Sequence, residues 1–336
     1  MRRSIAPAVG VAAGVGIAAV ATRRALARPD DFYATRGDGD EPWQAGTSGA
    51  VLPITYHRSE QVVSFHPISL EAARAVVPTD VLHPVRLPDG RAILAVSAAR
   101  YLEGTAPGAD PHDLCYGEVM VAVVVTRTPS PPLLPVVRAM LPGGGPSSIG
   151  VFLLHVAMTN RASRDVGRLL GFPAFVGDFA FEDGIEERRL GLSDDGRDIL
   201  RLRTPSTGRT FVDRQPMTTY SVLADQLLQI VSACSGVAHQ RLGRGAGGLE
   251  LGEHPVAESI RALDPSADAL VARSYLNLRL RIPRPSVVGT VRPYAGYAGT
   301  DREWGAYTIR YPDGSVIDLH AAGHGSGSTP PAASSS

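Results

Sequence analysis

The chain has 336 residues, enough for one large domain or two of ordinary size. Its 33 basic and 33 acidic residues cancel, so no net field would hold a polyanion, and we expect no nucleic-acid partner. Apolar residues make up 44% and charged residues 20%, which supports a buried core and excludes an intrinsically disordered chain. The sequence contains no lysine, so chemistry that needs a side-chain amine is excluded.

Residues 1–28 form an apolar N-terminal segment. Residues 5–21 carry no charge and are flanked by pairs of arginines. The length of this run lies between that of a signal-peptide core and that of a membrane-spanning helix. We therefore expect membrane attachment through residues 5–21 or a cleaved signal, with a helix that does not insert as a third option. The protein would then be membrane-associated or exported, and a cytoplasmic location stays open. Residues 29–49 read as a polar linker.

Residues 50–288 are predicted to form the folded body, mostly from strands. Apolar and β-branched runs bounded by Gly, Pro and Asp clusters are typical of strands. These runs are Ala92–Leu102, Tyr116–Thr126, Gly150–Met158, Ala174–Glu182, Arg188–Leu192 and Asp198–Arg203. Val271–Ile282 alternates, with Leu276, Leu278 and Leu280 on one face, as expected for a half-buried antiparallel strand.

Helix signals are fewer. They predict helices at Leu70–Val77, capped by Ser69, at Ser163–Leu170 and at Val256–Leu263. Residues 218–235 are ambiguous, because their leucines also suit a helical stripe. Many short strands with scattered helices predict an α+β fold around a closed or strongly curved sheet.

Beyond the body, residues 289–322 form an aromatic-rich extension in which 308–317 read as a hairpin. We expect this extension to pack over one end or one edge of the sheet. Residues 323–336 consist mainly of Gly, Ser, Pro and Ala, so they have little to bury and are predicted to be a disordered tail.

Common cofactor motifs are missing from the sequence. The glycines at 143–145 lack the Lys-Ser/Thr of a phosphate loop, and no serine stands in a Gly-x-Ser-x-Gly elbow. His112, Asp113 and Cys115 lie close together but lack an ordinary metal-ligand spacing. We therefore predict neither a cofactor nor a metal site.

Several segments, taken in their order along the chain, resemble those of a known protein family. They are Arg58 followed by residues 72–78, the Tyr116-x-Glu118 strand, Gly150 through Gly171-Phe172-Pro173, and Leu249 and His254 followed by Pro283. In this order and at this spacing, the chain from about residue 55 to residue 288 resembles the acetoacetate decarboxylase family. The resemblance implies an α+β fold, a curved or closed antiparallel β-barrel with a few short helices. It also implies an active site inside the barrel and a homo-oligomer.

The chain departs from that family at the catalytic amine. In the family, a lysine after the Gly-Phe-Pro proline forms a Schiff base with the β-keto acid, and a second lysine usually follows. Here these positions are Ala174 and Phe175, and no lysine elsewhere can replace them. The chain is therefore interpreted as a divergent member without Schiff-base decarboxylase activity.

The resemblance also implies site residues. Glu118 matches a strand glutamate that can move a proton, and Arg58 lies near a substrate-facing arginine that can hold a carboxylate. An inherited ion pair that braces the barrel is the structural alternative for these two residues. The remaining predicted ligand-binding residues are Tyr116, Glu103, Phe172, Ala174 and Phe175.

Three functions stay open at this point. The main hypothesis is a barrel protein that binds a small keto acid or an apolar ligand. The first alternative is an enzyme of the lyase or isomerase type that uses Glu118 and Arg58 for proton transfer on a carboxylate-bearing substrate. The second alternative is a scaffold subunit that binds no ligand.

Overall fold

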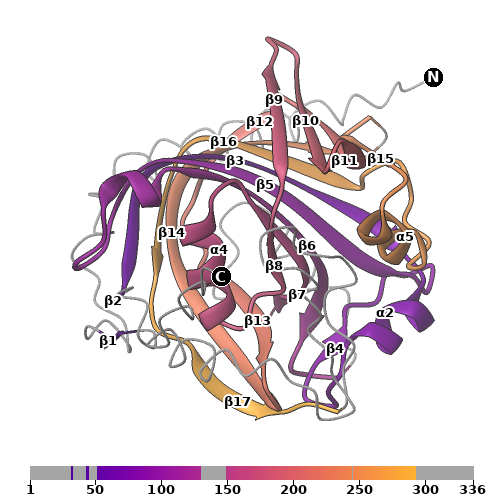
Figure 1. The fold of residues 1–336 in the computed structure, drawn as a ribbon. Coiled ribbons are helices and arrows are strands. Elements are labelled where there is room, and N and C mark those ends of the chain that lie inside the picture. Colours follow the sequence, from indigo (N-terminus) through magenta and orange to yellow (C-terminus); the bar gives the residue numbers. More distant parts are fainter. Residues whose placement is uncertain (1–31, 33–42, 45–50, 130–148, 244, 293–336) are drawn as a thin grey trace, which may run out of the picture.

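The computed structural model describes residues 32, 43–44, 51–129, 149–243 and 245–292 (Figure 1). The predicted N-terminal apolar segment at residues 1–28, the hairpin at 308–317 and the tail at 323–336 lie outside these residues. Within the described part of the chain, no helix is both long enough and apolar enough to cross a membrane. Membrane attachment through residues 5–21 therefore stays a prediction.

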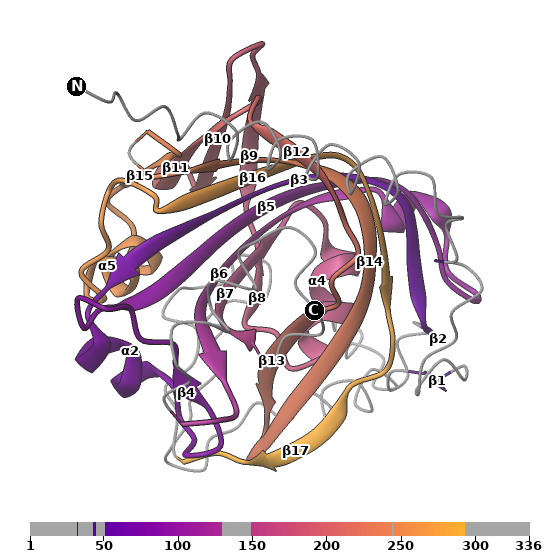
Figure 2. The ribbon, with the colours of Figure 1, turned by 180° about the vertical axis from the view of Figure 1, so that it is seen from behind.

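An eleven-stranded sheet dominates the described part of the chain and closes into a ring. The ring runs in the order β6-β5-β3-β16-β14-β13-β7, and β7 pairs back onto β6. Figures 1 and 2 show from opposite sides how these strands curve into a closed ring. The ring strands are β3 (Ile54–Ile68), β5 (Ala92–Thr105), β6 (Tyr116–Thr126), β7 (Ile149–Met158), β13 (Met217–Leu223), β14 (Gln226–Leu242) and β16 (Val271–Ile282).

Other strands extend the ring or lie outside it. Four join the ring strands, and a separate four-stranded sheet has the order β15-β11-β10-β9. The four are β4 (His83–Pro84), β8 (Ala174–Val176), β12 (Arg209–Asp213) and β17 (Ser286–Thr290). The separate sheet contains β9 (Asp178–Asp183), β10 (Glu187–Asp194), β11 (Arg197–Pro205) and β15 (Gly248–Leu251), and a short pair contains β1 (Trp43–Gln44) and β2 (Val51–Leu52).

Three short α-helices and one 3-10 turn are described: α2 (Leu70–Val76), α4 (Arg161–Leu169), α5 (Pro255–Arg261) and η1 (Pro111–Leu114). The side chain of Ser69 accepts a hydrogen bond from the Ala72 amide at 3.3 Å, as its predicted capping role requires. The predicted α+β class with a closed, curved sheet is thus confirmed. One detail differs, because the β13–β7 and β7–β8 pairings are parallel and not antiparallel.

Two local predictions need correction, and the ambiguity of residues 218–235 is resolved. The ambiguous segment at 218–235 belongs to β13 and β14, which pair with each other across a turn where Ala224 has a φ of 55°. The run predicted as one strand from Ala174 is divided between β8 and β9, which join different sheets. Leu276 is 51% exposed, because a register shift between Tyr275 and Leu278 interrupts the alternation of β16.

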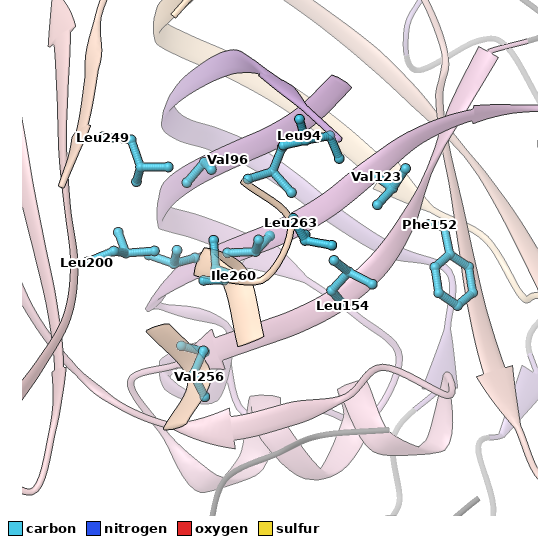
Figure 3. Packing of buried hydrophobic residues seen from close by; sticks show 14 of the residues in the cluster. Leu94, Val96, Val123, Phe152, Leu154, Leu200, Leu249, Val256, Ile260 and Leu263 are labelled. Carbon is cyan, nitrogen blue, oxygen red and sulfur yellow. The ribbon is translucent and has the colours of Figure 1, made fainter. Parts of the chain in front are cut away.

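The two faces of the ring bury different clusters. The outer face packs against α2, α5 and the four-stranded sheet, so one large cluster unites residues of β5, β6, β7, β11 and β15. Figure 3 shows Leu94 and Val96 of β5 in this cluster together with Leu200, Ile260 and Leu263. The inner face carries a second cluster that includes Tyr56, Tyr101, Met120 and Ala174. Alternate residues of one strand therefore serve the outer core and the ring interior.

Candidate functional site

A pocket of about 370 Å³ lies where α4 and the loop at 106–114 meet the inner face of the ring. We call it the Glu118 pocket. Its strand residues are Ile54 and Tyr56 from β3, Tyr116 and Glu118 from β6, Met158 from β7 and Ile282 from β16. Because these strands are far apart in the sequence, only closure of the ring brings the residues together.

Helix α4 closes one side of the Glu118 pocket. The side chain of Asn160 accepts a hydrogen bond from the Ser163 amide at 2.8 Å and caps the helix. The residues that α4 and its C-cap present to the pocket follow helical spacing: Ala162, Ser163, Asp165, Val166, Gly167 and Leu170. A Cβ at Gly167 would lie 2.9 Å from the Met158 methyl carbon, so glycine lets the helix approach β7 closely.

Three tyrosines surround the carboxyl group of Glu118. The Tyr101 hydroxyl donates to Oε1 of Glu118 at 3.1 Å, and the hydroxyls of Tyr56 and Tyr116 share a hydrogen bond of 3.0 Å. The rings of Tyr56 and Tyr101 stack with centroids 4.0 Å apart, and Tyr101 and Tyr116 lie 4.8 Å apart. The stacking fixes the direction of the hydroxyl groups, so Glu118 sits in a preorganised setting.

Burial changes the acidity of this cluster. Removal from water raises the pKa of Glu118 from 4.5 to about 7, although hydrogen bonds from Tyr101 and Tyr116 oppose the rise. Burial also raises the pKa values of Tyr56, Tyr101 and Tyr116, so all three hydroxyls stay protonated. At neutral pH the carboxyl group of Glu118 is therefore shared between its acid and its base form, and it can give or take a proton.

Replacing Tyr101 with phenylalanine is expected to raise the pKa of Glu118 above about 7, because the carboxylate loses a donor at 3.1 Å. A pH titration of the carboxyl carbon by NMR measures this value. Tyr220→Phe is the matched control, since the Tyr220 hydroxyl bonds to Gln229 instead. An unchanged or lower pKa in Tyr101→Phe would contradict the assigned hydrogen bond.

The charge of the pocket lining is one-sided. Among the described residues that line it, the ionisable carboxyl groups belong to Asp110, Asp113, Asp165 and Glu118, and none of the lining residues is basic. Asp165 is paired with Arg164 at 2.8 Å, whereas Asp110 and Asp113 are exposed. An anionic ligand would therefore meet acidic groups and no cation in this lining.

Two predicted site residues lie elsewhere. Arg58 and Glu103 are exposed and oppose each other on β3 and β5, away from the pocket lining. Register shifts on both sides of Arg58 are the cause, because they point Tyr56 and Ser59 inward and Arg58 outward. Arg58 is thus not placed to hold a carboxylate in the Glu118 pocket.

The two positions of the missing lysines face opposite sides of the sheet. Ala174 is fully buried in the inner cluster, behind the pocket lining of Gly167 and Met158. Phe175 packs in the outer cluster and does not reach the pocket. Of the residues predicted to bind ligand, Phe172 and Tyr116 lie in the lining of the Glu118 pocket, and Ala174 lies just behind it.

Sequence reasoning missed Tyr56, Tyr101 and the face of α4. Tyr101 could have been found, because it alternates with Ala99 and Ser97 along a predicted strand that needs one inward face. Tyr56 could not, since its inward direction depends on the bulge beside it. The pocket-lining residues of α4 could not be identified without knowing where the helix lies against the ring.

Comparisons with known proteins agree with this architecture. Residues 41–289 match the acetoacetate decarboxylase (ADC) family. A comparison with curated protein sequences found no match. The enduracididine biosynthesis enzyme MppR complexed with pyruvate superposes with a TM-score of 0.53 at 13% identity, covering 71% of this chain and 91% of MppR.

Two acetoacetate decarboxylase structures are similarly close. One superposes with a TM-score of 0.52 at 14% identity, covering 72% of this chain and 92% of its own. The enzyme from Legionella pneumophila superposes with a TM-score of 0.52 at 17% identity, covering 71% of this chain and 88% of its own. These superpositions indicate a shared fold, but sequence identities this low leave the reaction open. With the match over residues 41–289, the chain belongs to the acetoacetate decarboxylase family.

Proposed function

We propose that the protein binds a small, uncharged and mostly apolar ligand in the Glu118 pocket, without Schiff-base chemistry. The observation that carries this proposal is the pocket itself, an interior space lined by apolar and tyrosine side chains around one buried carboxyl group. The chain has no lysine side chain that could form an imine. The related fold of MppR was solved with pyruvate, which supports the idea that this architecture can hold a small molecule.

Of the two ligand classes in the main hypothesis, the pocket lining favours an apolar ligand over a keto acid. A keto acid is an anion at neutral pH, and an anion that leaves water for a buried site needs a paired cation. Arg58 is exposed, and the charged groups in the described lining are carboxyls. A neutral carbonyl or hydroxyl on the ligand can instead accept a hydrogen bond from protonated Glu118 or from Tyr116.

Filling the pocket is expected to abolish binding. In Ala162→Phe the larger side chain projects from α4 into the Glu118 pocket, and Ala262→Phe places the same change at the exposed end of α5. The probe is cyclohexanone, followed through the NMR signal of the Met158 methyl group, which lines the pocket. We expect the Met158 signal to move in the wild type and in Ala262→Phe, and to stay still in Ala162→Phe.

The same titration tests the charge of the ligand. Cyclohexanecarboxylate has nearly the size of cyclohexanone but carries a negative charge, and we expect it to bind at least tenfold more weakly. Equal or tighter binding of the carboxylate would restore the keto-acid hypothesis. If neither probe moves Met158 and native mass spectrometry of the purified full chain shows no bound small molecule, the scaffold alternative is favoured.

Proton transfer is a second candidate function, and the pKa of Glu118 near 7 favours it. In this case the Glu118 carboxylate removes a proton from the carbon next to a carbonyl group and returns a proton from solvent. The wild type should then exchange the α-hydrogens of cyclohexanone for deuterium in D₂O, faster as the pH rises through 7. Glu118→Gln should lose this exchange, whereas Glu103→Gln, an exposed glutamate on the neighbouring strand, should keep it.

A homo-oligomer and attachment to a membrane remain proposals from the sequence. Size-exclusion chromatography with light scattering tests the first on the full chain. Flotation of the full chain and of a variant without residues 1–28 on lipid vesicles tests the second.

A further inference from the structure

A second cavity of about 190 Å³ lies further along the interior of the ring. Its position follows from β6, where Glu118 lines the first pocket and the alternate residues Met120, Ala122 and Val124 line the second. Successive inward residues of a strand are about 6.7 Å apart, so the two spaces are neighbours in one interior. One inner cluster contains residues that line both spaces, such as Tyr56 of the first and Met120 of the second.

The second cavity holds two charged side chains that neutralise each other. Arg273 donates from Nη1 to Oδ2 of Asp213 at 3.3 Å and from Nε to Gln240 at 2.7 Å. The hydroxyl of Tyr275 donates to the same Asp213 oxygen at 2.7 Å. The backbone N–H of Gln215 donates to Oδ1 of Asp213 at 3.1 Å. These groups satisfy one another, and no other ionisable acid or base with a full charge at neutral pH lines the described wall. The cavity therefore presents no net charge to a ligand.

A different pair of polar side chains has bonding capacity left. Nε2 of Gln61 donates to the Ser97 hydroxyl oxygen at 2.7 Å, and both residues are less than 9% exposed and line the cavity. Within the described residues, the side chains of Gln61 and Ser97 form this one hydrogen bond. The side-chain carbonyl oxygen of Gln61 and the hydroxyl proton of Ser97 therefore remain available. The pair can accept and donate one hydrogen bond each.

We propose that this second cavity is a separate binding site for a neutral ligand with a polar head that both donates and accepts hydrogen bonds. A carboxamide or an alcohol on an apolar body has this chemistry. The head would bond to Gln61 and Ser97, and the body would contact the apolar wall that includes Val63, Ala95 and Val124. A cavity of about 150 Å³ can hold benzene, so about 190 Å³ accommodates a benzene-sized body.

The second cavity differs from the Glu118 pocket in its recognition chemistry. In the second cavity the head group would bond to the Gln61 amide and the Ser97 hydroxyl, and neither group has a charge that varies with pH. A full charge on the ligand would have to be buried without a free partner, because Asp213 and Arg273 already bond to each other. Binding to this site should thus be selective for neutral ligands and nearly independent of pH between 6 and 8.

Four probes of similar size test the proposal on the full chain: benzamide, benzyl alcohol, benzoate and ethylbenzene. Isothermal titration measures their affinities, and NMR of 13C-methyl methionine reports where they bind. Met120 and Met217 line the second cavity, whereas Met158 lines the Glu118 pocket. We expect benzamide and benzyl alcohol to move the Met120 and Met217 signals, and a shift of Met158 would report additional binding in the Glu118 pocket.

Two variants test the polar pair. Ser97→Ala and Gln61→Leu should each weaken benzamide about tenfold, because each removes one hydrogen bond to the head. Both should leave the affinity for ethylbenzene within about twofold, which shows that the variants are folded and the cavity is intact. Ala162→Phe fills the Glu118 pocket and should leave the benzamide-induced shifts of Met120 and Met217 unchanged, so the second site and the proposed function can fail independently.

The proposal is overturned by any of five results. Benzoate that binds as tightly as benzamide would contradict it, and so would ethylbenzene that binds as tightly as benzamide. Full affinity for benzamide in both Ser97→Ala and Gln61→Leu would contradict the role of the polar pair. Shifts confined to Met158 would place the probe in the Glu118 pocket, and no binding of benzamide at millimolar concentration would leave the second cavity without a ligand of this class.

Discussion

Replacing Glu118 with glutamine is expected to stabilise the protein above pH 7. Burial raises the pKa of Glu118 from 4.5 to about 7, so the folded protein holds a proton that the unfolded chain has already released. The free energy of unfolding therefore falls as the pH rises from about 4.5 to 7. The whole difference is roughly 3 kcal/mol, and glutamine avoids it because it has no charge to bury.

Urea unfolding at several pH values measures this effect. The curves of wild type and Glu118→Gln should nearly coincide below pH 4.5 and separate progressively up to pH 7. Glu103→Gln is the matched control, because Glu103 is exposed and its substitution should shift no part of the curve by more than about 0.5 kcal/mol. A Glu118→Gln variant that is less stable than wild type at pH 8 would show that the charged carboxylate is favourably bound.

Acid is expected to destabilise the protein through two buried histidines. Burial lowers the pKa of His66 and of His155 from 6.5 to about 4. Between these values the unfolded chain binds protons that the folded protein does not, so stability is present above pH 6.5 and is lost as the pH falls through 4. Each histidine contributes roughly 3 kcal/mol to this loss.

His66→Asn isolates one of the two contributions. The ring of His66 bonds through Nδ1 to the Ser266 carbonyl at 2.9 Å and through Nε2 to the Ser64 hydroxyl at 2.8 Å. Asparagine can keep a donor near the first of these but cannot take up a proton. We expect the variant to be less stable at pH 7 and to lose less stability between pH 6.5 and 4. Parallel curves for wild type and variant would rule out titration of His66 as a cause, and His112→Asn at an exposed site controls for the exchange itself.

Glu118 and the histidines act in opposite directions between pH 4.5 and 6.5. Protonation of the folded protein at Glu118 favours folding as the pH falls, whereas protonation of the unfolded chain at His66 and His155 opposes it. In Glu118→Gln the first contribution is gone, so the total loss of stability between pH 7 and pH 4 should be larger than in the wild type. One series of unfolding curves therefore tests both assignments.

The residue at the family's lysine position and the charge of the pocket lining lead to the same conclusion about the ligand. An imine-forming site needs an amine and a group that holds the substrate carboxylate. This chain has Ala174 in the place of the amine, and the arginine expected to hold the carboxylate, Arg58, points to solvent. In the lining of the Glu118 pocket, Glu118 is the buried carboxyl group, and the described lining holds no cation. Such a setting suits neutral ligands better than keto acids.

Local patterns in the sequence were sufficient for much of the fold. The bounds predicted for Tyr116–Thr126 and Val271–Ile282 agree with β6 and β16, because long apolar or alternating runs dominate these segments. The cap at Ser69 follows from short-range chemistry. The order of motifs, read from the sequence, indicated the family, and the sequence has no lysine that could form an imine.

The sequence by itself thus determined the class of fold, the place of Glu118 on a buried strand and the absence of a catalytic amine, because each depends on residue type or on neighbours along the chain. Only the tertiary structure decided that Tyr101 joins Glu118, that Arg58 and Glu103 face outward, and that Gln61 and Ser97 share a second cavity. These outcomes depend on register shifts and on closure of the ring, which set neighbours between strands that are far apart in the sequence.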